Sequence, residues 1–243
     1  MALASFKDLC LDSGDVPRLA GFWRQVLGGQ LYLRNNGVGR LEPLAGRPAS
    51  EVVWINPVPE PRIGKTRVHL DLRLAAPDPA GLLSAGTAVV RAPAGHARHW
   101  VLADPEGNQF CAFPPDEPVA GDPNQSHRPG EPGVFQLVTD CRDSEAQAAW
   151  WAQLLGGSAV AKEYGAVLVG AEGFPWEGWL FQPVPEPKTV KNRVHWDLSL
   201  AAPVPDELLG VGASVLREPG GDIDWWVLAD PEGNEFCAFP AER

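Results

Sequence analysis

The same twelve-residue segment occurs twice in this chain. ADPEGNQFCAFP occupies residues 103–114, and ADPEGNEFCAFP occupies residues 229–240, with one substitution between them. Two further segments return 126 positions later, RVHLDL at 67–72 as RVHWDL and PVPEP at 57–61 unchanged. A period of this length is the size of a domain and exceeds the roughly 20–50 residues of solenoid repeats. The sequence is therefore a tandem duplication.

Composition places the boundary between the two copies. Residues 116–133 are rich in Pro, Gly and Asp and have no apolar periodicity, which is typical of a linker. We therefore predict one domain at 1–115 and a second at 134–243. A core is feasible, because 44% of all residues are hydrophobic.

Charge and hydropathy restrict the class of partner. The net charge of −11 argues against a nucleic acid or an anionic membrane, since phosphate groups would be repelled. No apolar stretch approaches the roughly 18–20 residues that span a bilayer. The first residues also lack the basic and apolar regions of a signal peptide. We expect a cytoplasmic protein, monomeric or homodimeric, whose partner is a small molecule.

Local patterns predict several strands and one main helix in each copy. In the first copy, Asp15 is a suitable N-cap, and apolar residues then recur at helical spacing until Gly28. A short helix is predicted at 78–85, and strands are predicted at 5–11, 39–44, 51–58, 68–74, 89–93, 98–103 and 109–113. The predicted fold class is α+β with antiparallel sheets.

The segment VHLDLRL, which starts at Val68, alternates strictly between apolar and polar residues. Successive side chains of a strand point to opposite faces, so His69 and Asp71 share the face away from the leucines. His195 and Asp197 take the corresponding positions in the second copy. We predict that the leucines pack towards a helix and that the polar face lines a cleft.

Four blocks occur in the same order in both copies. They are the helix ending in LGG, PVPEP, HxDL and DPEGNxFCAF. Together they resemble the vicinal oxygen chelate (VOC) superfamily of glyoxalases, extradiol dioxygenases and bleomycin-resistance-type binding proteins, and more narrowly tandem glyoxalase-like domain proteins. The resemblance implies two tandem domains. Each would be a pair of βαβββ modules whose curved, mostly antiparallel sheets surround a cleft.

The resemblance also implies positions for metal ligands. These are Asp8, Asn56, His69 and Cys111 in the first copy, and Gln136, Gln182, His195 and Cys237 in the second. The implied cofactor is a divalent metal such as zinc, iron, nickel or manganese. Many relatives have glutamate where both copies have cysteine. A thiolate suits zinc or iron better than hard cations, and the change also removes a carboxylate that could act as a base.

Other residues are candidates for catalysis or ligand binding, each with a purely structural alternative. His69 and His195 are the catalytic candidates, and each could instead be a hydrogen-bonded structural histidine. His99 is an extra candidate in the first copy, where the second has tryptophan. The predicted ligand-binding residues are Asp71, Asp197, Trp54, Trp100, Trp225, Trp226, Cys111 and Cys237, although the tryptophans could equally form core.

Three functions remain open at this point. The first is a glyoxalase-like enzyme that binds a small oxygenated, aromatic molecule and acts by metal-assisted proton transfer, as a lyase or isomerase. The second is a non-catalytic binding protein that sequesters such a ligand, as drug-resistance proteins do. The third is a duplication in which one copy has lost its cleft and supports the other.

Overall fold

The computed structural model of the chain describes residues 2–115 and 133–241. The predicted linker therefore lies outside the described residues except for Gly133. The first repeat contains β1 (Ala4–Ser13), α1 (Val16–Leu27), β2 (Gln30–Leu33), β3 (Gly39–Glu42), a short 3₁₀ helix (Ala49–Glu51), β4 (Val53–Pro57), β5 (Val68–Arg73), α2 (Ala80–Ser84), β6 (Ala88–Arg91), β7 (Trp100–Ala103) and β8 (Gln109–Phe113).

The second repeat has the same order of strands and α-helices and, within its described residues 133–241, lacks the 3₁₀ helix. It contains β9 (Gly133–Cys141), α3 (Ser144–Leu155), β10 (Ser158–Lys162), β11 (Gly165–Val169), β12 (Gly178–Pro183), β13 (Val194–Leu200), α4 (Asp206–Gly210), β14 (Ser214–Arg217), β15 (Trp226–Ala229) and β16 (Glu235–Phe239). The predicted α+β class is confirmed, and most strand pairs are antiparallel. Strand β2 and the 3₁₀ helix were not predicted, because their residues show no clear periodicity.

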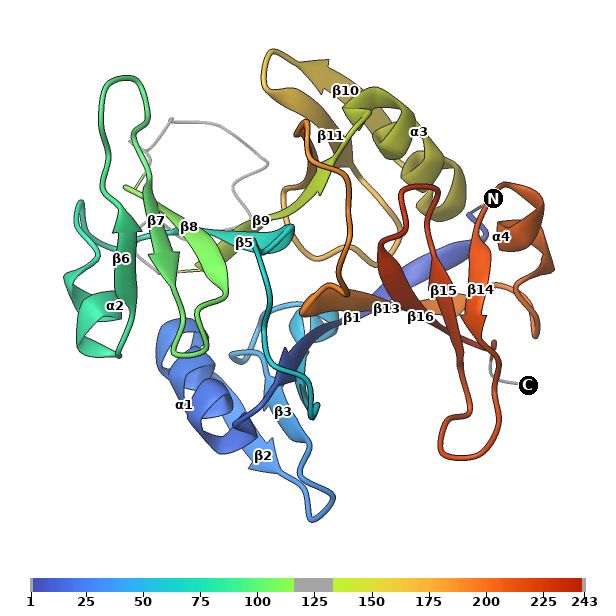
Figure 1. Cartoon of the computed structure of the whole chain (residues 1–243), viewed down its shortest axis with the longest axis horizontal. Coiled ribbons are helices and arrows are strands. Elements are labelled where there is room, and N and C mark those ends of the chain that lie inside the picture. Colours follow the sequence, from blue (N-terminus) through green and yellow to red (C-terminus); the bar gives the residue numbers. More distant parts are fainter. Residues whose placement is uncertain (1, 116–132, 242–243) are drawn as a thin grey trace.

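Each sheet is built from both repeats. Sheet 1 has the order β14-β15-β16-β13-β1-β4-β3-β2, and sheet 2 has the order β10-β11-β12-β9-β5-β8-β7-β6. The antiparallel pairs β1–β13 and β5–β9 join the repeats at the centre of each sheet. Figure 1 shows β6 to β8 at one end of the molecule and β14 to β16 at the other. The two βαβββ modules of one repeat therefore belong to different sheets.

The main helices pack between the two sheets. Helix α1 follows a strand of sheet 1, yet its Trp23 contacts Phe110 of sheet 2, with ring centroids 5.4 Å apart. Helix α3 follows a strand of sheet 2, and its Trp151 contacts Trp196 of sheet 1 at 5.3 Å. Residues of both sheets and both helices form one continuous hydrophobic cluster. A single core therefore supports both repeats.

The repeated DPEGN segment has a structural explanation. The Asp104 carboxylate closes its own turn by accepting the backbone N–H groups of Glu106 and Asn108, both at 2.9 Å. The Glu106 carboxylate then accepts the Ser13 hydroxyl at 2.5 Å and the Asp15 backbone N–H at 2.9 Å. Since Glu106 follows β7 of sheet 2 and Asp15 caps α1, this turn fastens one module of the repeat to the other.

The second repeat makes the same contact with fewer bonds. Glu232 accepts the backbone N–H groups of Arg142 and Asp143, at 2.7 and 2.9 Å, at the start of α3. Glu106 has in addition an ion pair with Arg193 at 2.9 Å, in which both side chains are largely buried. The motif therefore recurs because each repeat must join two modules that lie in separate sheets.

Candidate functional site

A cleft of about 1370 Å³ lies on the face of sheet 2 that points away from the core. Residues of β5, β8, β9 and β12 line it, together with residues of the β6–β7 and β10–β11 hairpins. Small-molecule sites commonly have about 300–1,000 Å³. This cleft is therefore large enough to take a small organic molecule and water.

The alternation predicted for β5 places its polar residues in this cleft. Leu70 and Leu72 are 3% and 0% exposed in the core, whereas His69 and Asp71 line the cleft. Cys111 lies beside Asp71, because β5 and β8 pair in register at these two residues. The prediction that the polar face of this strand lines a cleft is confirmed for the first repeat.

His69, Asp71 and Cys111 form a compact group. His69 Nε2 lies 3.5 Å from Asp71 Oδ1 and 3.7 Å from Cys111 Sγ. One ligand atom from each of the three residues lies within 4.8 Å of the others. Asp71 is only 4% exposed, and its buried Oδ1 has no hydrogen-bond partner. Such an atom is costly to bury, so a hydrogen-bond donor or a cation beside Oδ1 would stabilise the group.

Burial sets the protonation of the group. Burial raises the pKa of the Asp71 carboxyl to about 7, although a hydrogen bond with Cys111 opposes the shift. Burial also raises the pKa of the Cys111 thiol well above its ordinary value, and the neighbouring Asp71 adds to this. The pKa of His69 falls to about 4 through burial, with smaller effects of Lys65 and His99. The imidazole is thus neutral and available as a ligand at neutral pH.

The donor set fits a transition metal. Zinc bonds of about 2.0–2.3 Å in tetrahedral geometry place ligand atoms about 3.3–3.8 Å apart, and the distances from His69 Nε2 to the other two atoms lie in this range. One nitrogen, one oxygen and one sulfur donor suit zinc or iron rather than magnesium. Three ligands beneath a cleft would leave a further coordination position for a small molecule.

The ligand sets implied for each repeat are divided between the sheets. Asp8 and Asn56 lie on β1 and β4 of sheet 1, away from His69 and Cys111 in sheet 2. Gln136 and Gln182 line the sheet 2 cleft instead, and Gln136 pairs in register with Asp71. A site that contains His69 therefore takes its remaining neighbours from the second repeat.

Sheet 1 contains a related group of side chains, which form hydrogen bonds with one another. Cys10, His195 and Asp197 have ligand atoms within 4.8 Å of one another. The Cys10 thiol donates to Asp197 Oδ1 at 3.4 Å, and Cys237 also hydrogen-bonds Asp197. Burial raises the pKa of Asp197, but His195 and Cys10 both oppose that shift. Cys10 was not among the predicted site residues, although its even spacing from Asp8 on one strand could have indicated it.

Two indole rings lie over this part of sheet 1. Trp54 donates through Nε1 to Asp8 Oδ2 at 3.1 Å. Trp225 stacks on Phe239 with centroids 5.1 Å apart and hydrogen-bonds Cys237. The polar group of sheet 1 is therefore flanked by the protein's own aromatic side chains.

The remaining predicted tryptophans lie elsewhere. Trp100 on β7 and Trp226 on β15 pack against the hydrophobic core. The next residue of β7, Val101, points to the opposite face and lines the cleft. None of the four predicted ligand-binding tryptophans is among the described residues that line the sheet 2 cleft. Phe113, Phe135 and Tyr164 provide its aromatic surface instead.

The arrangement of modules and sites defines a tandem VOC-type protein. A sequence profile of the glyoxalase-like domain family matches residues 8–113 and 136–239. The chain therefore belongs to the glyoxalase-like domain family, which confirms the predicted resemblance. No curated protein sequence matches the chain. Within the described residues, no helix is both long and apolar enough to cross a membrane.

Two solved structures show the same fold across nearly the whole chain. Glyoxalase I from Zea mays is 14% identical, with a TM-score of 0.65 over 98% of this chain and 92% of that chain. The cppA protein from Streptococcus pneumoniae TIGR4 is 11% identical, with a TM-score of 0.53 over 99% and 100% of the two chains. At these identities the likeness concerns the fold alone.

Proposed function

We propose that the chain binds a small oxygenated organic molecule in the sheet 2 cleft and changes it by metal-assisted proton transfer, as a lyase or isomerase. The observation that carries this proposal is the group of His69, Asp71 and Cys111 in the cleft, in which a buried carboxylate oxygen has no hydrogen-bond partner. Perturbed titratable groups in a cleft are typical of functional sites.

The three side chains would hold a divalent ion, with zinc and iron best suited to the donor set. When bound, such an ion polarises a substrate oxygen and makes an adjacent C–H group more acidic. Cys111 must release a proton to act as a ligand, and so must the protonated fraction of Asp71, because burial raises the pKa of both groups. Gln136, next to Asp71 across the β5–β9 pair, can donate an amide N–H to the substrate.

The experiment has a binding part and a chemical part. Zinc affinity is measured by competition with a chromophoric chelator for the full chain, His69→Ala and His195→Ala. Proton exchange in D₂O is then followed by NMR for a panel of α-hydroxy and α-keto compounds. We expect His69→Ala alone to lose tight zinc binding and exchange. Unchanged zinc affinity and exchange in His69→Ala would contradict the proposal.

A second candidate is a binding protein that does no chemistry. One observation favours it: if Asp71 serves as a ligand, two further carboxylates of the described cleft, Asp140 and Glu177, are already paired with Lys65 at 2.5 Å and Arg73 at 2.8 Å. A base would then have to come from a hairpin. Recovery of every bound ligand unchanged, with zinc bound and no proton exchange, would favour this candidate.

A further inference from the structure

The hairpin between β6 and β7 brings positive charge to a strongly acidic protein. Arg91, His96, Arg98 and His99 all line the sheet 2 cleft, while the chain as a whole has a net charge of −11. Four basic or titratable side chains within nine residues of one hairpin are thus directed to the cleft. This concentration needs an explanation that the metal-binding group does not provide.

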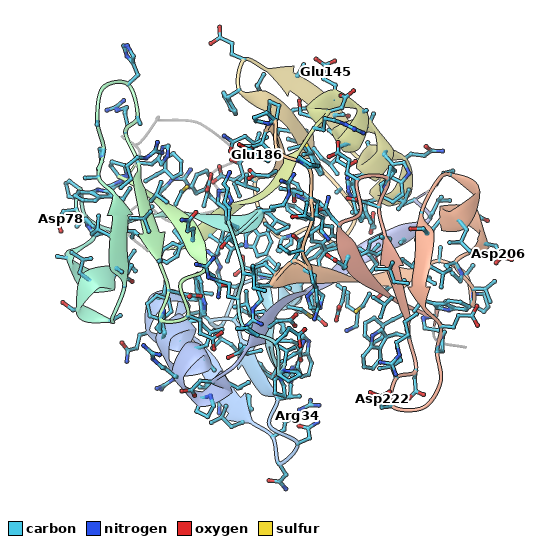
Figure 2. All side chains as sticks on the ribbon, viewed as in Figure 1. Arg34, Asp78, Glu145, Glu186, Asp206 and Asp222 are labelled. Atoms are coloured by element: carbon cyan, nitrogen blue, oxygen red, sulfur yellow. The ribbon has the colours of Figure 1, made fainter. Side chains whose placement is uncertain are left out.

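The second repeat reverses the charge at the same positions. The segment RAPAGHARHW at 91–100 corresponds to REPGGDIDWW at 217–226, so that His96 and Arg98 are replaced by Asp222 and Asp224. Arg217, the counterpart of Arg91, is ion-paired with Asp222. Figure 2 shows Asp222 at the end of this hairpin, which belongs to sheet 1.

The cations of the first hairpin have no such neutralisation. Arg91 contacts His99, with Nη2 and Nε2 3.2 Å apart, rather than a carboxylate. Within the described ranges 2–115 and 133–241, neither Arg91 nor Arg98 forms an ion pair with a carboxylate, whereas Lys65 and Arg73 in the same cleft are paired with Asp140 and Glu177. The cleft therefore contains two guanidinium groups that remain available to a ligand.

Arg91 acts electrostatically on two other groups of the cleft. The pKa of His99 is lowered by burial and by Arg91. Burial and Asp71 raise the pKa of Cys111, and Arg91 opposes this with a smaller effect that favours the thiolate. Like charges held close together without a counterion attract an anion. A negative ligand group near the hairpin would lie within reach of the metal-binding group.

An aromatic surface adjoins these cations. The His99 ring lies against Phe113 with centroids 4.8 Å apart and planes at 34°. Phe113 in turn meets Phe135 edge to face at 5.3 Å. All three rings line the cleft. A flat apolar ligand body can pack on such rings while a polar group at its end meets the guanidinium groups.

We propose that the cleft of sheet 2 is selective for small aromatic oxyanions, whose carboxylate or phosphate group binds Arg91 and Arg98 and whose ring packs on Phe113 and Phe135. This inference rests on the proposed function, for which it names the substrate class. Guanidinium groups recognise planar oxyanions through paired N–H donors, and such charge-assisted bonds are stronger than neutral ones.

The test compares two probes of nearly equal size, phenylacetate and the neutral phenylacetamide. Each is titrated into ¹⁵N-labelled full chain that has been freed of metal with a chelator, so that neither probe can bind through an ion. We expect phenylacetate to bind about tenfold more tightly than the amide at low ionic strength, as one charge-assisted contact predicts. The shifts should fall on β5, β8 and residues 92–99.

Matched variants assign the preference to the hairpin. The double variant Arg91→Gln/Arg98→Gln should bind phenylacetate no better than the amide, while Arg217→Gln should keep the full preference. Both variants should still bind zinc, because neither changes a residue of the metal-binding group, and Arg217→Gln should keep the full zinc affinity.

Three outcomes would overturn the inference. They are equal affinity for the two probes, a preference that survives the double variant, and the absence of binding by either probe. The proposed function is tested separately, by zinc affinity and proton exchange in His69→Ala. A failure of the proposed function can therefore be distinguished from a failure of anion selectivity.

Discussion

The two sheets carry equivalent polar groups and hairpins, but their surroundings differ. Sheet 2 has an open cleft, a partly unsatisfied Asp71 and a cationic hairpin. Sheet 1 has Asp197 bonded to Cys10, two flanking indole rings and an acidic hairpin. The difference shows that duplication kept DPEGN and the His, Asp and Cys of each polar group, while the residues that surround those groups diverged.

A single position explains much of the difference between the two polar groups. Cys10 on β1 corresponds to Val138 on β9, and each lies beside the histidine of its sheet. Each aspartate is hydrogen-bonded to the cysteine of its neighbouring strand, but the Cys10 thiol gives Asp197 a second donor, whereas Val138 gives Asp71 none. A buried carboxylate with one unpaired oxygen is suited to bind a cation, whereas one with both donors in place is suited to a structural role.

The largest expected difference between the sheets is in metal affinity. His69→Ala removes one of three ligands in sheet 2 and should weaken zinc binding by about 100-fold or more. His195→Ala should change the affinity of the strongest site by less than about threefold, because Asp197 is already satisfied. Competition titration measures both. Equal losses in the two variants would show that the sheets are equivalent.

The contacts that fasten the modules should also differ. Glu106→Ala removes the acceptor for two backbone N–H groups and the Ser13 hydroxyl, together with a buried ion pair to Arg193, and should lower the free energy of unfolding by about 2–4 kcal/mol. Glu232→Ala removes two backbone contacts and should cost about 1–2 kcal/mol. Urea denaturation measures the difference. A larger loss for Glu232→Ala would contradict this ranking.

The pH dependence of stability should depend on Asp71 more than on Asp197. In the metal-free protein the folded pKa of Asp71 is about 7 and the ordinary value is 3.8, so folding favours its protonated form. Its contribution is present at low pH and is lost as pH rises from about 4 to 7, by about 2–4 kcal/mol. Asp71→Asn should remove this slope, and Asp197→Asn should remove a smaller one.

Urea denaturation at several pH values between 4 and 8 measures both slopes. Zinc should restore the stability of the unmodified chain at pH 7, because the ion favours the ionised carboxylate. It should not do so for Asp71→Asn. An Asp71→Asn protein that keeps the full slope would show that another group is responsible.

The smallest expected effect comes from exchanging the position that distinguishes the sheets. Cys10→Val should leave Asp197 without its thiol donor and cost about 1 kcal/mol. Val138→Cys should give Asp71 a second donor and make zinc binding to sheet 2 weaker by about twofold to fivefold, since this added bond must be broken first. Thermal unfolding and zinc competition measure these changes. No change in either variant would mean that this position is not decisive.

Much of the fold followed from the sequence because its physical signals are local. Alternation in VHLDLRL placed His69 in a cleft, and the spacing from Asp15 predicted α1. The pairing of β1 with β13 could not be predicted from the sequence. Strands β5 and β13 are nearly identical in sequence, so either could be the partner of β1. The division of the implied ligand sets between the sheets is a direct consequence of that pairing.

The candidate site was predictable only in part for a related reason. The reversed charges at His96 and Arg98 are visible in the sequence. Their meaning depends on which cleft the hairpin faces, and that is a property of the sheet order. The tryptophans also could not be assigned from the sequence, because the same indole serves core, sheet surface or ligand site according to its neighbours.

The most direct test is a crystal soaked with zinc and measured at the zinc absorption edge. Anomalous scattering locates the ion without assumptions about its ligands. The account predicts one strong peak bonded to His69, Asp71 and Cys111 beneath the open cleft. A peak bonded to Cys10, His195 and Asp197, with none in sheet 2, would contradict it.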